Sequence, residues 1–152
     1  ALPFEVCGAP FIDAPALADQ LNTLGLGGVR YRPHVFTPTA SKYAGEVCGG
    51  VQAHITGAEY RPLLAWVAVI REIRRRYPVE FSWLPPYSEG GFIPFDRLAG
   101  GPDLRQQIEA DEPLDTLAAS WDRSAETWRE TRRACLLYED ITSRDINHAD
   151  QA

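Results

Sequence analysis

The chain contains no methionine and only three cysteines in its 152 residues. Without a methionine, Ala1 cannot be an unprocessed start, and we expect a chain that was cut, processed or prepared as part of a longer protein. Cys7, Cys48 and Cys135 are too few and too scattered for a disulfide framework, and none forms the CxxC pair of a structural zinc site. We interpret all three as small buried residues, and one disulfide bridge stays open.

Long apolar runs and an excess of basic residues are missing as well. No run approaches the ~18 residues that cross a membrane, and no stretch resembles a signal peptide. The 15 basic and 21 acidic residues give a net charge of -6, which disfavours nucleic acid and anionic membranes as partners. Because 45% of the residues are hydrophobic, the chain can bury a core without metal or disulfide staples. We expect a single domain over residues 1–139 without a cofactor, and a frayed tail over 140–152.

The hydrophobic periodicity predicts an α+β fold, in which a small, mostly antiparallel sheet is covered by about three main helices and some short ones. Strands are predicted at residues 4–9, 29–37 and 48–56, and helices at 13–24, 60–77 and 122–138. Pro102 and Pro113 introduce short helices. The period of two places seven strand residues toward the core, namely Val29, Tyr31, Pro33, Val35, Val51, Ala53 and Ile55.

Each main helix has a predicted apolar face. The first begins after Asp13 as its N-cap and places Leu17, Leu21 and Leu24 inward. The second places six residues inward, Leu63, Trp66, Val67, Ile70, Ile73 and Tyr77, and the last places four inward, Trp121, Ala125, Trp128 and Cys135. Arginines at 71 and 74–76 crowd the end of the second helix, where they suit the helix dipole and indicate a solvated face rather than a partner site.

Two segments are irregular. Gly45, Gly49 and Gly50 around the start of the third strand indicate a bulge or the close approach of another backbone. Residues 78–94 are rich in proline, glycine and aromatic residues, with a short strand predicted at 81–84. The aromatic rings of this segment, among them Trp83 and Tyr87, either pack the loop itself or line a groove on which a sugar ring stacks.

The polar positions of the second and third strands form the best candidate site. If these strands are neighbours, Arg32, His34, Gln52 and His54 point the same way, and the long loop between the strands adds Ser41, Lys42 and Tyr43. Such residues suit a hydroxyl-rich ligand that bears a carboxylate. The alternative is that this face packs on a neighbouring domain or faces water.

The sequence offers no catalytic apparatus of its own. Glycoside hydrolysis ordinarily uses a pair of carboxyl groups, and the candidates Glu46, Glu89 and Asp96 have no companion at a diagnostic spacing. Asp96 suits the start of a helix or a local salt bridge. No HExxH, GxSxG or complete GxGxxG motif is present, and the histidines lie at no metal-ligand interval.

Four motifs, in order along the chain, point to a family. PFEVCGAPFID begins at Pro3, FTPTASKYAGEVCGGVQAHIT covers residues 36–56, FDRLAG begins at Phe95, and ACLLYE closes the set at residues 134–139. With these motifs the chain resembles the C-terminal part of the peptidoglycan exo-β-N-acetylmuramidases, the NamZ family.

The resemblance implies a function and partners. Family members have a Rossmann-like N-terminal domain, absent here, and a substrate cleft between the two domains. The principal acidic residue then belongs to the missing domain, the substrate is a muropeptide or cell-wall glycan with terminal N-acetylmuramic acid, and this chain alone is inactive. A periplasmic or secreted location is implied, and a cytoplasmic one stays open. The alternative function is a non-catalytic carbohydrate-binding or interaction domain.

Overall fold

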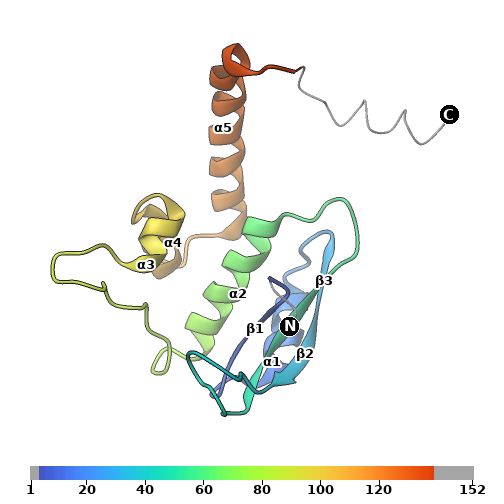
Figure 1. Cartoon of the computed structure of the whole chain (residues 1–152). Helices are drawn as coiled ribbons and strands as arrows, with labels where there is room; N and C mark the ends of the chain where they lie inside the picture. Colours follow the sequence, from blue (N-terminus) through green and yellow to red (C-terminus); the bar gives the residue numbers. More distant parts are fainter. Residues whose placement is uncertain (1–3, 139–152) are drawn as a thin grey trace. The chain divides into compact units, whose positions relative to one another are not determined.

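The computed structural model of the chain describes residues 4–138. The three strands lie in the first part of the chain, with α1 between β1 and β2, and helices follow β3 (Figure 1), which confirms the predicted α+β class. The described chain forms two compact units, one up to Leu114 and one from Asp115. The single domain over 1–139 therefore stays a prediction, and the predicted tail over 140–152 lies outside the described residues. The elements are β1 (Val6–Ala9), α1 (Ala14–Thr23), β2 (Val29–Phe36), β3 (Cys48–Ile55), α2 (Pro62–Arg76), α3 (Pro94–Ala99), α4 (Asp103–Glu109) and α5 (Leu114–Arg132), followed by a short 3-10 helix (Arg133–Cys135).

The sheet is antiparallel in the order β1-β3-β2, so β3 lies in its centre. Val51 of β3 is paired with Cys7 of β1 and with Pro33 of β2. The predicted register is confirmed, because Val51 and Ala53 are buried in the core while Gln52 points to the opposite face. The central strand therefore has side chains buried on both faces.

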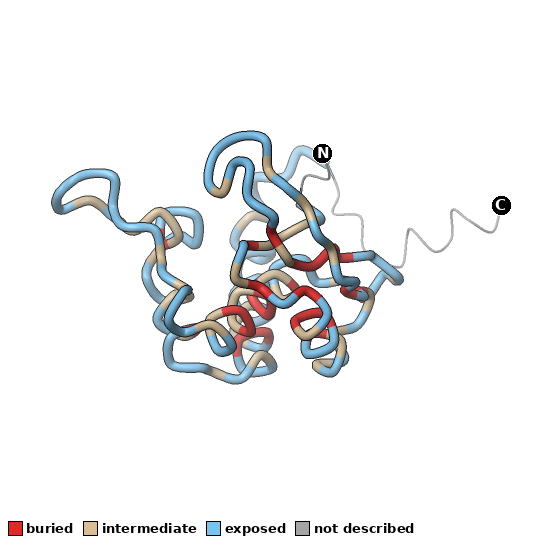
Figure 2. Tube along the Cα trace, turned by 90° about the horizontal axis from the view of Figure 1, so that it is seen from below, coloured by how far each residue is buried: buried red, intermediate tan, exposed pale blue. Residues whose placement is uncertain are grey.

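Helices α1 and α2 contribute with the sheet to one core, and Figure 2 shows the buried positions gathered between these helices and the strands. The predicted N-cap of α1 is confirmed, because the Asp13 carboxylate accepts the Ala16 N–H at 3.0 Å. Leu17 and Leu21 of α1 are fully buried, and α2 presents the small residues of its buried face to the same core. The residues that α2 contributes to this core are Ala65, Ala68, Val69 and Ile73.

The outer edge of β2 is protected against further strand pairing. The Asn22 side chain of α1 donates to the Tyr31 carbonyl at 2.7 Å and accepts the Tyr31 N–H at 3.0 Å. Pro33 follows at the next outward position and has no N–H to expose. The Tyr31 hydroxyl crosses the core and donates to the Ala65 carbonyl at 2.9 Å, which joins the sheet to α2.

Several residues that were predicted to face the core are exposed. Leu63 lies in the first turn of α2 and is 53% exposed, because the small residues on the other side of this helix face the sheet. Pro33, Val35 and Ile55 are exposed although they have the predicted direction, since the first two lie on the outer strand β2 and Ile55 is the last residue of β3. The alternation therefore predicted direction correctly and burial only in part.

The close backbone approach predicted around Gly49 and Gly50 is confirmed. A Cβ atom on Gly49 would collide with the Ile12 carbonyl oxygen, and one on Gly50 would collide with the Cys7 carbonyl oxygen. The predicted alternative, a bulge, is not present, since β2 and β3 pair without interruption from Phe36↔Cys48 to Val29↔Ile55.

Residues 78–93 form an irregular segment, and no strand is present at 81–84. Trp83 packs between Phe81 and Phe95, with ring centroids 5.1 Å and 4.6 Å away, and its indole N–H donates to Glu109 at 2.9 Å. Loop packing is therefore the observed role of Trp83. Tyr87, by contrast, is 84% exposed.

The arginines near the end of α2 take part in a structural network rather than forming a purely solvated face. Arg71 pairs with Asp111 at 2.7 Å, and Arg75 pairs with Glu72 at 3.2 Å and with Asp111 at 3.5 Å. The two ion pairs with Asp111 join α2 to the turn that follows α4.

The last helix begins earlier than predicted, at Leu114 instead of residue 122, because Pro113 is a favourable residue at a helix start. Trp128 is 63% exposed, and Ala125 and Cys135 are exposed as well, so the predicted inner face is not buried. The physical reason is composition, since charged and hydroxyl residues dominate this half of the helix. Within residues 4–138, no helix combines the length and the apolar character needed to cross a membrane.

Candidate functional site

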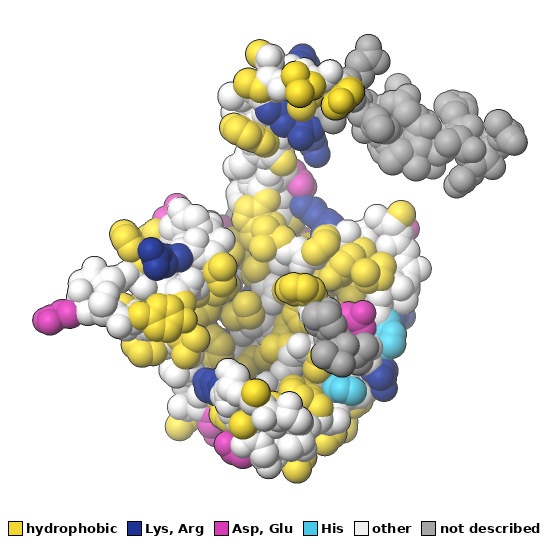
Figure 3. Space-filling view, viewed as in Figure 1, with side chains coloured by type: hydrophobic (Ala, Val, Ile, Leu, Met, Phe, Trp, Pro, Cys, Tyr) yellow, Lys and Arg dark blue, Asp and Glu magenta, His cyan; other side chains and the backbone are white. Residues whose placement is uncertain are grey.

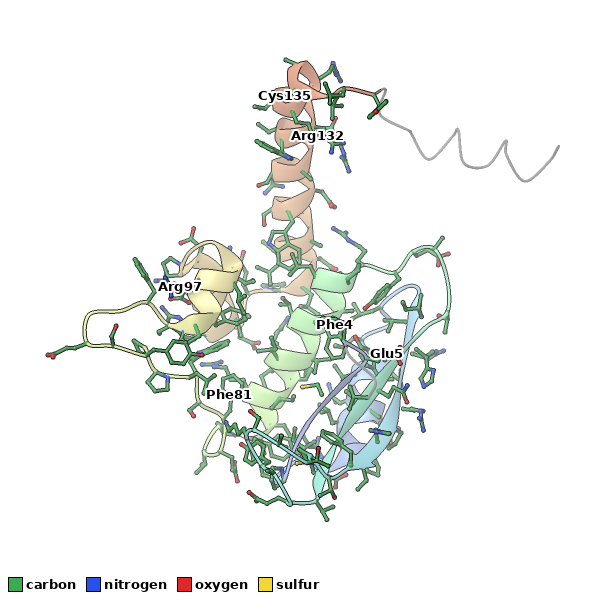
Figure 4. The ribbon with its side chains drawn as sticks, viewed as in Figure 1. Phe4, Glu5, Phe81, Arg97, Arg132 and Cys135 are labelled. Carbon is green, nitrogen blue, oxygen red and sulfur yellow. The ribbon has the colours of Figure 1, made fainter. Side chains whose placement is uncertain are left out.

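The polar face of the sheet carries the candidate site. We define the polar face by Glu5, Arg32, His34, Gln52 and His54, which lie on the side of the sheet opposite to the core. Arg32 is directly paired with Gln52 across β2 and β3, so their side chains share one side. Figure 3 shows histidine side chains beside acidic and basic ones in this region, and Figure 4 shows Phe4 and Glu5 together just before β1.

Hydrogen bonds connect four of these side chains in a row. The Arg32 Nε–H donates to Gln52 Oε1 at 2.9 Å and to His54 Nε2 at 2.9 Å, and Arg32 Nη2 also donates to Gln52 Oε1. Gln52 Nε2 in turn donates to Glu5 Oε2 at 3.0 Å. Because both ends of the Gln52 amide are engaged, its orientation is fixed, and the residue is only 6% exposed.

The charge of Arg32 is held without a direct counter-charge. Arg32 forms no ion pair with any residue between 4 and 138, and the neutral amide of Gln52 separates it from Glu5. His54 accepts from Arg32 through Nε2 and adds no negative charge to the cluster. The cluster thus presents a cationic group that an anionic ligand can approach.

His34 lies farther along the same face. Its ring stacks on Phe36 with the centroids 5.8 Å apart, and both residues are half-buried. This pair extends the polar face toward the loop that joins β2 and β3.

The three predicted site residues of that loop lie apart from the arginine. Ser41 and Lys42 are exposed, and Lys42 Nζ lies 4.9 Å from the centre of the Tyr43 ring. Tyr43 is half-buried and packs against the core, so it also supports the fold. The loop leaves β2 after Phe36, four residues beyond Arg32 and hence about 13 Å along the strand. The structure therefore joins Arg32, Gln52 and His54 in one cluster. Ser41, Lys42 and Tyr43 lie in the loop beyond the end of β2, outside this cluster.

Glu5 is the site residue that the sequence analysis missed. It precedes the first strand, and its carboxylate reaches Gln52 only because β1 pairs with β3. The available signal was a single acidic residue inside the apolar stretch PFEVCGAPF.

The candidate carboxylates have different environments. Asp96 is buried in the first turn of α3 and pairs with Arg105 of α4 at 2.8 Å, so its observed role is structural. Glu46 and Glu89 are exposed on separate loops. Among residues 4–138, no group of three or more histidine, cysteine, aspartate or glutamate side chains has the arrangement of a metal site.

An apolar groove adjoins the polar face at Glu5. It has a volume of about 770 Å³ and lies between the β1 region and the start of α2. Cys7 lies in it, and burial raises the pKa of this thiol. The residues that line the groove are Phe4, Glu5, Val6, Cys7, Ile55, Tyr60, Pro62 and Trp66.

The fold and this surface define the class of protein, an α+β domain with a polar sheet face and an adjoining apolar groove. The family is shown by sequence. Residues 1–138 match the model of the family described as "Exo-beta-N-acetylmuramidase NamZ, C-terminal", and the chain belongs to this family.

Two relatives agree with this assignment. The chain is 36% identical over 137 residues to the peptidoglycan beta-N-acetylmuramidase NamZ of Bacillus subtilis (strain 168), an alignment that covers 90% of the chain and 32% of that protein. It also resembles the crystal structure of a DUF1343 family protein from Bacteroides fragilis, with a TM-score of 0.76 and 25% identity, over 91% of the chain and 36% of that structure. The chain thus spans about a third of the length of these relatives.

Proposed function

We propose that the whole protein is a glycoside hydrolase that releases terminal N-acetylmuramic acid from peptidoglycan fragments, and that the polar face of this chain forms one wall of its substrate cleft. The family and the B. subtilis relative support the substrate class. The single observation that carries the cleft wall is the hydrogen-bonded row from Glu5 through Gln52 and Arg32 to His54, on the side of the sheet away from the core.

The chemistry of this row suits the sugar. N-acetylmuramic acid presents hydroxyl groups, an acetamido group and the carboxylate of its lactyl group. Arginine supplies charge-assisted donors for the carboxylate, and the imidazole groups of His34 and His54 exchange hydrogen bonds with the remaining polar groups. His34, Ser41, Lys42 and Tyr43 extend the proposed binding surface along β2 and its loop.

The chemical step belongs to the rest of the protein in this proposal. Asp96 is engaged by Arg105, and Glu46 and Glu89 lie on separate exposed loops, so none of the three is placed as one of a catalytic pair. We infer that the N-terminal domain of the same protein supplies the principal acid and covers the apolar groove beside Glu5. Cell-wall glycan as the substrate favours a periplasmic or secreted protein.

A chromogenic β-N-acetylmuramide tests the proposal. We expect turnover by the full-length protein and none by this chain. Turnover by neither would favour the alternative, a non-catalytic carbohydrate-binding domain, and turnover by this chain alone would show that its own carboxylates are catalytic.

A further inference from the structure

We propose that Arg32 binds the carboxylate of the sugar ligand through one edge of its guanidinium group, and that Gln52 is the positioning residue that holds this edge outward. The inference rests on the proposed function and deepens it, because it assigns recognition of the acidic group to one side chain. It also gives Arg32 a different role from Lys42, the other cation of the predicted site, because only Arg32 is assigned to the carboxylate.

The hydrogen bonds of Arg32 leave one edge of its guanidinium unused. The Nε–H and one N–H of Nη2 are directed at Gln52 Oε1, and the same Nε–H also reaches His54. Five N–H donors are present in total, so both N–H groups of Nη1 and one of Nη2 remain. One N–H of Nη1 and the remaining N–H of Nη2 are parallel, and together they form the two-pronged edge that binds a carboxylate with two hydrogen bonds. Arg32 is exposed, so a ligand can reach this edge.

Gln52 fixes the direction of that edge. Its backbone lies in the central strand, the residue is 6% exposed, and its amide is oriented by the bond to Glu5 at 3.0 Å. A guanidinium held in this way loses little conformational freedom when a ligand binds. A carboxylate at position 52 would have neutralised Arg32, whereas the glutamine amide orients it and leaves its charge available.

Neither neighbouring cation has this support. Arg30 lies on the same strand and the same face, two residues away, yet its side chain has no hydrogen bond or ion pair with a residue in the described part of the chain. Lys42 is exposed on a loop, and its ammonium lies over the Tyr43 ring. A point charge of this kind lacks the fixed fork of Arg32.

The test compares two ligands in the full-length protein. N-acetylmuramic acid carries the free carboxylate, and its lactyl amide has nearly the same shape without the charge. Calorimetry would measure the binding of both, and the chromogenic muramide would give kcat and KM. The variants are Arg32→Ala, Arg32→Lys and Gln52→Leu, with Arg30→Ala as the control that removes the same charge from the same face.

We expect Arg32→Ala to weaken binding of the acid at least tenfold and binding of the amide less than twofold, because only the acid uses the charged fork. We expect the loss in KM rather than in kcat, because the carboxylate takes no part in bond breaking and its contact with Arg32 forms already when the substrate binds. Arg32→Lys should recover only part of the loss. Gln52→Leu should reduce the preference for acid over amide although it keeps the arginine, and Arg30→Ala should change neither ligand's affinity by more than twofold.

An active protein in which Arg32→Ala leaves the preference for the acid unchanged, or weakens acid and amide equally, would overturn this inference and leave the proposed function standing. If Arg30→Ala lowers the preference for acid over amide as much as Arg32→Ala does, the effect comes from the general charge of the face. That result would also overturn the inference. A full-length protein that turns over no muramide and binds neither ligand would remove both proposals.

Discussion

Gln52 shows how one buried amide determines the properties of an exposed site. Burying an amide is unfavourable unless its donors and acceptor are satisfied. Here Arg32 satisfies the oxygen and Glu5 satisfies the nitrogen. The hydrogen bonds that offset the cost of burying the Gln52 amide therefore also hold the guanidinium of Arg32 at the surface.

Lys42 gives the first prediction. Its side chain is exposed, so Lys42→Ala should change the melting temperature very little. In the full-length protein we expect substrate use to fall roughly tenfold, or ~1.4 kcal/mol, because a charge-assisted contact to the ligand is lost. The measurement is kcat/KM on the chromogenic muramide beside a thermal melt. Lys42→Arg, which keeps the charge, is the matched control.

A large drop in melting temperature would instead show that Lys42 holds the loop in place through Tyr43. Unchanged stability together with unchanged activity would remove this loop from the binding surface.

Tyr31 predicts a pH dependence of stability. Burial, and to a smaller extent Tyr60, raises the pKa of its phenol above the ordinary value of 10.0. The unfolded chain releases this proton near pH 10.0 whereas the folded chain keeps it, so the unfolding free energy falls as the pH rises above 10.0. We expect Tyr31→Phe to be less stable than the parent chain by about 1 kcal/mol at neutral pH, because the bond to Ala65 is lost.

That deficit should disappear in strongly alkaline solution, since phenylalanine has no proton to release. Urea denaturation at about pH 8 and about pH 11 would measure it. A deficit of equal size at both values would mean that Tyr31 ionises normally in the folded chain.

Among the elements, β3 depends most on close packing of the backbone. Gly49 and Gly50 allow the strand to pass the Ile12 and Cys7 carbonyls. We predict that Gly49→Ala destabilises the domain by about 1–3 kcal/mol, because the rigid backbone of residue 12 must shift. Chemical denaturation would measure this loss.

Gly101→Ala is the matched control for this substitution. Nothing lies within 4 Å of the position of its Cβ, and its backbone is not left-handed. It should alter stability by less than about 1 kcal/mol. Equal effects of the two substitutions would contradict the role assigned to the close approach.

The two edges of the sheet differ. The outer edge of β2 is covered by Asn22 and interrupted by Pro33, whereas β1 is short and adjoins the apolar groove. At the β1 edge the groove leaves apolar surface exposed, and such surface is where another part of a larger protein can pack. This contrast agrees with our proposal that the N-terminal domain of the whole protein covers the groove on the β1 side.

At the scale of the whole molecule, we predict the order in which the three cysteine thiols react with an alkylating reagent. All three are free, and they are half-buried at position 7, buried at 48 and exposed at 135. We predict that iodoacetamide labels Cys135 first, Cys7 more slowly and Cys48 slowest, because the thiolate must be accessible and burial keeps the Cys7 thiol protonated. Mass spectrometry of labelled peptides measures the three rates.

In denaturant the three rates should converge, which provides the internal control. Rapid labelling of Cys48 in the native chain would contradict its burial, and resistance of Cys135 would contradict its exposure. A mass that reveals a disulfide would contradict the free thiols.

The sequence by itself determined much of the unit that carries the polar face. The periods of two and 3.6 predicted the three strands, α1 and α2 close to their observed bounds, since local side-chain spacing reports which residues share a face. The same period brought Arg32, Gln52 and His54 to one side, because two antiparallel neighbours joined by a loop have a register that their apolar residues fix. The family followed from the four motifs.

Only the tertiary structure decided which of those residues act together. Glu5 reaches Gln52 across 47 positions of sequence, and Asp96 pairs with Arg105 from another helix, so neither partner is visible in local spacing. Exposure of Trp128 and Ile55 was also undetermined, because periodicity gives the direction of a side chain and not what covers it. Pairing between distant elements is a property of the assembled sheet, and it is this pairing that holds the guanidinium group of the exposed Arg32 in one orientation.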